Sequence, residues 1–165
     1  MRSRVGLGFD VHPFGDAPPL ILAGVHIADA PRLAGHSDGD AVAHAVADAL
    51  LGPAGLPDLG TLFPATDDRY NNADSMVLLR EVAERVLHEG WWIENVDVVV
   101  AAEQPKLGPH VEAMNANLIA AMHKAREPMG RGIAATVKPK RGEGLGAIGR
   151  AEGVAVWAVA LLSRS

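Results

Sequence analysis

The sequence has no cysteine, few aromatic residues and no long apolar run. Without cysteine, neither a disulfide framework nor a thiolate zinc site can form, so any bound metal must use His, Asp or Glu ligands. Aromatic residues make up 4% of the chain, which argues against the base-stacking surfaces of single-strand-binding proteins. The longest apolar run, 154–162, is far shorter than the roughly 20 residues that cross a bilayer. We therefore expect no membrane partner and read this run as a buried strand.

The remaining composition is that of a globular protein. A net charge of −5 gives no general attraction to nucleic acid. The single basic cluster, Lys138, Lys140 and Arg141, is suited to binding a phosphate. A hydrophobic content of 48% over 165 residues predicts one compact domain, 1–165. The N-terminus carries no signal-peptide pattern, and together with the lack of cysteine this favours a cytoplasmic location.

Helical and strand patterns alternate along the chain. Ser37 or Asp38 is placed to cap a helix that Gly52-Pro53 would stop, and Asp74 is placed to cap the next. Helices are expected at 38–51, 74–90 and 109–124, and strands at 4–12, 20–27, 92–102, 133–138 and 152–162. The first two strands could pair as a hairpin, and 53–72 is expected to be a long loop. This order predicts an α/β class fold, an α+β sandwich with a mixed sheet packed against helices.

Three residues have the spacing of a metal site. Asp10 and His12 lie two apart in an expected strand, so their side chains project from one face. His44 lies between Asp40 and Asp48 at i−4 and i+4, a polar stripe on the first helix. If this stripe faces the strand, Asp10, His12 and His44 form a two-His, one-carboxylate set that leaves a zinc position open for substrate.

Other histidines and one glycine motif have ordinary explanations. A lone histidine is usually a surface or hydrogen-bonded residue, and His26, His88, His110 and His123 have no convincing partner at ligand spacing. Residues 144–149 match the dinucleotide-binding pattern G-x-G-x-x-G, but a strand-like segment follows instead of a helix. We therefore predict no dinucleotide site.

Several motifs together resemble a known enzyme family. They are Gly8-Phe9-Asp10-Val11-His12, His36-Ser37-Asp38-Gly39-Asp40 leading to His44, Asp58-Leu59-Gly60 with Phe63-Pro64, Pro105-Lys106, and Gly149-Arg150-Ala151-Glu152-Gly153. Their order and gaps are similar to those of the 2-C-methyl-D-erythritol 2,4-cyclodiphosphate synthases over nearly the full chain. The resemblance implies a homotrimer that converts 4-diphosphocytidyl-2-C-methyl-D-erythritol 2-phosphate to 2-C-methyl-D-erythritol 2,4-cyclodiphosphate and CMP. This is a metal-dependent phosphorus-oxygen lyase reaction of non-mevalonate isoprenoid synthesis.

The resemblance also implies roles for individual residues. Zinc would be held by Asp10, His12 and His44, with a substrate phosphate oxygen as the fourth ligand, and Glu143 would hold a second divalent ion, magnesium or manganese. His36 and Ser37 would contact the reacting phosphates, with His36 and Arg141 counted as catalytic. The remaining substrate contacts would be Asp58, Leu59, Gly60, Phe63, Asp67, Lys140 and Gly142. A cytidine pocket from a neighbouring subunit would comprise Ala102, Glu103, Gln104, Pro105 and Lys106, and Arg150 would line a central cavity.

The chain departs from the family pattern at three places. Arg141 stands where a threonine is usual, Ala65 where an acid is usual, and Ala147 where an aromatic residue is usual. Arg141 either grips a phosphate with its two-pronged guanidinium, or points to solvent or pairs with Glu143. Two alternatives to the synthase therefore stay open. One is a zinc-dependent phosphohydrolase, and the other is a catalytically altered trimeric protein that binds metal or nucleotide.

Overall fold

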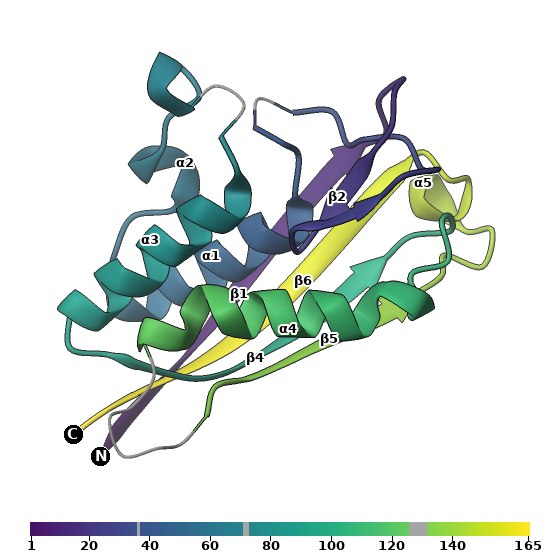
Figure 1. The fold of residues 1–165 in the computed structure, drawn as a ribbon. Helices are drawn as coiled ribbons and strands as arrows, with labels where there is room; N and C mark the ends of the chain where they lie inside the picture. Colours follow the sequence, from purple (N-terminus) through teal and green to yellow (C-terminus); the bar gives the residue numbers. More distant parts are fainter. Residues whose placement is uncertain (36, 71–72, 126–131) are drawn as a thin grey trace.

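A four-stranded mixed sheet forms the centre of the computed structural model, which describes residues 1–35, 37–70, 73–125 and 132–165 (Figure 1). The strands follow the order β1 (Arg2–Pro13), β6 (Gly153–Arg164), β4 (Trp92–Ala101) and β5 (Ala134–Lys140). β6 pairs antiparallel with β1 and with β4, whereas β4 and β5 are parallel. The predicted α+β class with a mixed sheet is confirmed.

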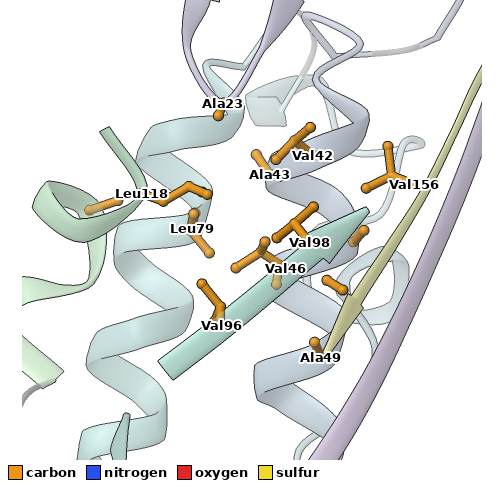
Figure 2. Close-up of a cluster of buried hydrophobic side chains, with 14 of the residues drawn as sticks. Ala23, Val42, Ala43, Val46, Ala49, Leu79, Val96, Val98, Leu118 and Val156 are labelled. Atoms are coloured by element: carbon orange, nitrogen blue, oxygen red, sulfur yellow. The ribbon is translucent and has the colours of Figure 1, made fainter. Parts of the chain in front are cut away.

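Three helices cover one face of this sheet: α1 (Ala41–Ala54), α3 (Ser75–His88) and α4 (Val111–Met122) (Figure 1). Their apolar side chains meet those of the strands in the core (Figure 2). Val46 from α1, Leu79 from α3 and Val98 from β4 are all fully buried there. The opposite face of the sheet carries no helix among the described residues and exposes the aliphatic and aromatic side chains Val5, Leu7, Phe9, Val11, Trp157 and Val159.

Two glycines let α1 lie directly on β1. A Cβ atom at Gly6 would come within 2.0 Å of the Ala49 carbonyl oxygen, and one at Gly8 within 1.9 Å of the Ala45 carbonyl oxygen. Real Cβ atoms do not approach other atoms so closely, so only glycine fits at either position. The close contact brings the side chains of α1 against β1 around Gly6 and Gly8.

The first helix begins and ends later than predicted. Asp40, not Ser37 or Asp38, is the N-cap, and its carboxylate accepts bonds from the backbone N–H of Val42 and Ala43. The helix continues through Pro53 to Ala54, and Gly55 ends it at φ 84°. A proline in the last turn removes only one backbone bond, while the left-handed conformation that glycine tolerates ends the helix. The Gly52-Pro53 stop was therefore wrong by one turn.

The expected strand 20–27 is instead a small hairpin of its own. β2 (Leu20–Leu22) pairs with β3 (Val25–Ile27), and Ala23 and Gly24 turn the chain at φ 48° and 69°. Two consecutive residues with positive φ match the tight turns that join antiparallel strands. The expected pairing with 4–12 is wrong, because β1 pairs with β6 along its whole length.

Short helical segments complete the chain. They are α2 (Leu59–Leu62) and η1 (Asp68–Tyr70) within the expected loop, η2 (Gly108–His110) and η3 (His123–Ala125) on either side of α4, and α5 (Gly146–Gly149). α5 takes up the glycine-rich motif, and β6 follows it, so the dinucleotide pattern lacks its long helix. In the described ranges, no helix has the length and apolar character needed to cross a membrane.

Candidate active site

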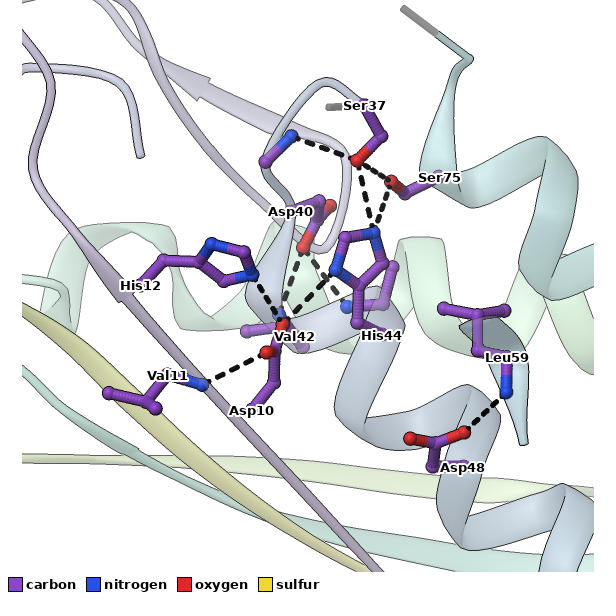
Figure 3. A network of polar contacts seen from close by, with 12 residues as sticks. Asp10, Val11, His12, Ser37, Asp40, Val42, His44, Asp48, Leu59 and Ser75 are labelled. Atoms are coloured by element: carbon purple, nitrogen blue, oxygen red, sulfur yellow. Dashed lines mark hydrogen bonds and ion pairs between the residues drawn. The ribbon is translucent and has the colours of Figure 1, made fainter. Parts of the chain in front are cut away.

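Asp10 and His12 on β1 converge with His44 on α1 (Figure 3). Asp10 Oδ2 lies 3.1 Å from His12 Nε2 and 3.1 Å from His44 Nδ1. One donor atom from each residue lies within 4.8 Å of the other two. The predicted convergence of these three side chains, which depended on the helix facing the strand, is confirmed.

A backbone carbonyl fixes the orientation of His12. Its Nδ1 lies 2.6 Å from the Ala34 carbonyl oxygen, which can only accept a hydrogen bond. Nδ1 must therefore carry the proton, and in the neutral ring the Nε2 lone pair points toward Asp10. Metal-binding histidines commonly use one nitrogen for the ion and donate the other N–H to an oxygen in this way.

A serine and an aspartate fix the orientation of His44. Its Nε2 lies 2.9 Å from Ser75 Oγ, and the Ser75 hydroxyl donates to Asp38 Oδ1. Since the Asp38 carboxylate only accepts, the Ser75 oxygen is left to accept from His44 Nε2–H. In the neutral ring, the Nδ1 lone pair of His44 then points toward Asp10. Asp38 is itself held by the backbone N–H groups of Asp40 and Ser75.

The donor set and its spacing fit a divalent metal ion. A tetrahedral ion with bonds of about 2.0–2.1 Å separates its ligand atoms by roughly 3.3 Å, close to the 3.1 Å separations found here. Three electron-rich atoms repel one another at this range unless a cation lies among them. Hydrogen bonds partly offset this repulsion in the metal-free protein. Burial acts to raise the pKa of Asp10, but the hydrogen bonds to His12 and His44 outweigh it and lower the pKa to about 2. The Asp10 hydrogen bond raises the pKa of His12.

A cavity of about 270 Å³ opens beside this cluster. Four of the predicted substrate residues line it together with Asp10 and His44: Ser37, Leu59, Gly60 and Phe63. Asp58, the next predicted contact, caps α2 by accepting the Thr61 N–H at 2.8 Å, which places the α2 turn at the edge of the cavity. The cavity thus joins the metal cluster to the segment expected to hold substrate hydroxyls.

A second, separate cleft of about 190 Å³ lies where β4 and β5 end. The Ala102 N–H donates to the Lys140 carbonyl oxygen at 2.9 Å, which keeps the two chain segments together. The predicted cytidine residues Ala102, Glu103, Pro105 and Lys106 line this cleft with Lys140 and Arg141. None of the described residues that line it lines the cavity at the metal cluster.

Arg141 has a partner that the sequence did not reveal. Its guanidinium binds the Glu103 carboxylate through Nε at 3.1 Å and through a second, very short bond from Nη2. Glu103 also accepts the Gly142 N–H at 3.0 Å. Glu143 follows in an exposed turn at φ 52°.

Other predicted site residues lie apart from these two cavities. Asp67 is bound by the Arg69 guanidinium at 2.6 Å, and Arg150 pairs with Glu152, also at 2.6 Å. Gln104 lines a third cavity with Phe14 and Ala151 instead of the cleft. His36 lies outside the described residues.

The predicted site omitted several residues that the structure places in it. Asp48, which accepts the Leu59 N–H at 2.8 Å, lines the metal-side cavity, and burial raises its pKa. Its position four residues after His44 was visible as part of the polar stripe. Asp38 and Ser75 had no such signal for a role behind His44, because they lie 37 residues apart and meet only in the folded chain.

A family model and several known proteins match this chain. The YgbB family model matches residues 3–163. The 2-C-methyl-D-erythritol 2,4-cyclodiphosphate synthase of Bordetella avium is 50% identical over 161 residues, which cover 98% of this chain and 96% of that protein. The protein of the same name from Salinibacter ruber is 50% identical over 155 residues, covering 94% of this chain and 95% of that one.

Solved structures of similar proteins share the fold. A 2C-methyl-D-erythritol-2,4-cyclodiphosphate synthase with CDP bound is 36% identical with a TM-score of 0.84, covering 97% of this chain and 100% of that one. The bifunctional IspDF from Campylobacter jejuni is 41% identical with a TM-score of 0.90 over 99% of this chain. This chain spans 43% of that longer protein.

Proposed function

Since the chain belongs to the YgbB family, in which its relatives are named 2-C-methyl-D-erythritol 2,4-cyclodiphosphate synthases, we propose that it makes this cyclic diphosphate. The substrate is 4-diphosphocytidyl-2-C-methyl-D-erythritol 2-phosphate, and the second product is CMP. The observation that carries the proposal is the convergence of Asp10, His12 and His44 beside the cavity of Leu59 and Gly60. The reaction belongs to non-mevalonate isoprenoid synthesis.

The reaction is an internal displacement at phosphorus. An oxygen of the substrate 2-phosphate attacks the phosphorus attached to the C4 oxygen, and the bond from that phosphorus to the oxygen bridging to CMP breaks. CMP leaves with the bridging oxygen and its electron pair, so no water is consumed and no protein nucleophile is needed. What the protein must do is bring two negatively charged phosphates together and hold them in line.

The metal cluster and the turn that contains Glu143 reduce the repulsion between the two phosphates by binding cations. Asp10, His12 and His44 hold zinc, and Glu143 holds a second divalent ion, magnesium or manganese. These ions supply positive charge that offsets the charge of the phosphates. Ser37 and His36 contact the reacting phosphates, and Asp58, Leu59 and Gly60 hold the methylerythritol hydroxyls, with Phe63 and Asp67 in the same segment.

The cleft at the ends of β4 and β5 holds the cytidine end of the substrate. This assignment is supported by the residues that line the cleft. They include Ala102, Glu103, Pro105 and Lys106, which the resemblance places in the cytidine pocket. Gln104 contributes backbone to the same turn, Lys140 and Gly142 form the facing turn, and Arg150 lines the central cavity of the trimer. The CDP complex of the similar synthase makes a cytidine nucleotide the natural first ligand to test.

A homotrimer completes the active site. Among the described residues, the two cavities share no lining side chain, and the resemblance to the synthases implies that a neighbouring subunit supplies the cytidine cleft to each metal cluster. The uncovered apolar face of the sheet supplies the surface for that association. On this face the ring centroids of Phe9 and Trp157 lie 5.2 Å apart. Residues 1–165 form one domain in each subunit, and the enzyme acts in the cytoplasm, which cell fractionation would check.

Phosphorus NMR tests the reaction directly. Incubated with the substrate, zinc and magnesium, the purified protein is expected to give equal amounts of CMP and the cyclic diphosphate. Release of inorganic phosphate instead would identify a phosphohydrolase. Binding of zinc and CMP without turnover would identify a catalytically altered homologue, for which Ala65 and Arg141 are the departures from the family pattern that stand out.

A further inference from the structure

Glu103 joins the two turns that form the cytidine cleft. It lies just after β4, and its carboxylate reaches across to the turn after β5, where one oxygen binds Arg141 and the other accepts the Gly142 N–H at 3.0 Å. Its side chain is only 14% exposed, whereas that of Arg141 is 53% exposed. The carboxylate is thus held in place by the opposite turn, and Arg141 covers it from the solvent side.

The turn that Glu103 holds is constrained on its other side as well. A Cβ atom at Gly142 would come within 2.4 Å of the Gly149 backbone nitrogen, so this turn packs directly on α5. Glu143 follows at φ 52°, a left-handed conformation that is unfavourable for a residue other than glycine. A residue held in such a conformation needs support from its surroundings. The bonds to Glu103 are part of that support.

The charge of Arg141 also affects the cleft, because it offsets the negative charge of Glu103. The cleft is lined by Lys106 and Lys140, which attract a phosphate, and by one carboxylate, Glu103, which repels it. The guanidinium neutralises that carboxylate and holds the pKa of Glu103 below its ordinary value. A threonine at 141 would leave the carboxylate charged and facing the bound nucleotide.

We propose that Arg141 is a positioning residue, which supports nucleotide binding by holding and neutralising Glu103 and does not itself bind a phosphate. This inference rests on the proposed function, because it takes the cleft of Ala102 to Lys106 as the cytidine site. It explains how a chain with arginine at this position keeps a cleft suited to an anion: arginine and Glu103 act as a pair.

A double-mutant cycle tests the pair through CMP binding, without relying on turnover. Isothermal titration calorimetry would measure CMP affinity of the trimeric, zinc-loaded protein for the parent, Arg141→Thr, Glu103→Gln and the double variant. We expect Arg141→Thr to weaken CMP binding about 3- to 5-fold, as for loss of one partner in a half-exposed pair. Glu103→Gln keeps an acceptor for the Gly142 N–H and removes the charge that Arg141 neutralises, so its CMP affinity is the baseline against which the double variant is compared.

The double variant decides between the two roles of Arg141. If Arg141 acts through Glu103, Arg141→Thr has little further effect in the Glu103→Gln background, and the double variant binds CMP within about two-fold of Glu103→Gln alone. An equal loss on Arg141→Thr in both backgrounds would show a direct phosphate contact and overturn the inference. No loss in any variant would overturn it too. Lys124→Thr, which removes the cation of the exposed Lys124–Glu84 pair, is the matched control and should bind CMP as the parent does.

The parent protein separates this inference from the proposed function. If it binds CMP no better than AMP, the cytidine cleft is wrong and the inference falls with it. If it binds CMP selectively but forms no cyclic diphosphate, the proposed reaction is wrong, and the cycle still decides the role of Arg141.

Discussion

At the scale of single residues, the three converging side chains make metal content the first quantity to measure. Because His44 supplies one of three donor atoms, His44→Ala should lose stoichiometric zinc and cyclisation together, with zinc affinity falling by at least about 100-fold. Metal analysis after dialysis measures the first and phosphorus NMR the second. His88→Ala, an exposed histidine near the end of α3, is the control and should keep both. Full zinc content in His44→Ala would contradict the site.

Ser75 tests whether the contacts behind His44 matter. Removing its hydroxyl takes away the nearer acceptor for His44 Nε2–H, at 2.9 Å, and leaves only Ser37 Oγ, at 3.2 Å, to orient the ring. We expect Ser75→Ala to lower zinc affinity about 10- to 100-fold, the usual effect of losing a partner behind a metal ligand. Ser163→Ala removes a hydroxyl of similar burial that bonds Glu94 on the sheet. Equal zinc affinity in the two variants would show that Ser75 has no orienting role.

The metal-free protein should show a defined pH window of stability. The Asp10 carboxyl has an ordinary pKa of 3.8 and a folded pKa of about 2, so its contribution is present above pH 3.8 and is lost as pH falls through 2. His12 has its pKa raised above 6.5, so its contribution is complete below pH 6.5 and is lost as pH rises through the folded value.

The ion pair of Asp10 and His12 therefore stabilises the metal-free fold most between about pH 4 and 6.5. Thermal unfolding of EDTA-treated parent and Asp10→Asn would check this, with the largest difference in melting temperature expected in that window. A difference that stays constant from pH 5 to pH 9 would contradict the assignment. Bound zinc should abolish the dependence above pH 6.5, since the ion replaces the proton on His12.

The sequence was sufficient to predict that Asp10, His12 and His44 converge, but not which residues orient the two histidines. Asp10 and His12 share a face because strand side chains alternate, a regularity that needs no knowledge of the fold. The partner of Arg141 was missed for the opposite reason. Glu103 lies 38 residues away and reaches Arg141 only because β4 and β5 are parallel and end side by side.

At the scale of elements, the contact of α1 with β1 determines whether His44 reaches Asp10. Gly8→Ala would place a methyl group within 1.9 Å of the Ala45 carbonyl oxygen and force the helix away from the strand. We expect a loss of at least about 3 kcal/mol in the free energy of unfolding, as for severe overpacking, together with weakened zinc binding.

A second glycine provides the control for this substitution. Gly52 lies at an exposed position in α1, the helix that packs on Gly8. A methyl group added there would meet no atom of another described element within 4 Å. Gly52→Ala should therefore stabilise the protein by up to about 1 kcal/mol through helix propensity. Chemical denaturation of both variants measures the difference. Equal effects of the two substitutions would show that the close packing at Gly8 does not hold α1 in place.

The elements themselves were predictable to different degrees. Helix α3 begins after Asp74 as expected, because an aspartate N-cap followed by apolar residues at helical spacing is a strong local signal. The partner of β1 was not predictable, since pairing with β6 joins opposite ends of the chain. Local signals decide whether a segment is a strand, but burial across the whole fold decides which strand lies beside it.

At the scale of the whole molecule, the face of the sheet that the described helices leave uncovered calls for a partner. Leu7 is 68% exposed and Phe9 49% exposed, on a strand whose opposite face is covered by α1. Such an apolar surface is unusual for a monomer and typical of a subunit interface. The three metal ligands lie within one subunit, whereas the proposed substrate site needs a cleft from the next, so assembly and metal binding are separable.

Leu7→Lys tests this separation. A lysine in the apolar interface would have its charge desolvated without a partner, an unfavourable change of at least about 2 kcal/mol per subunit. We expect size-exclusion chromatography with light scattering to give a trimer for the parent and a monomer for the variant. The variant should still bind one zinc per chain, because Asp10, His12 and His44 are all its own, but should lose cyclisation. Ile119→Lys, which alters an exposed apolar residue on α4, should remain trimeric and active. A parent that is monomeric and active, or a monomeric Leu7→Lys that keeps full turnover, would show that one subunit contains the whole site.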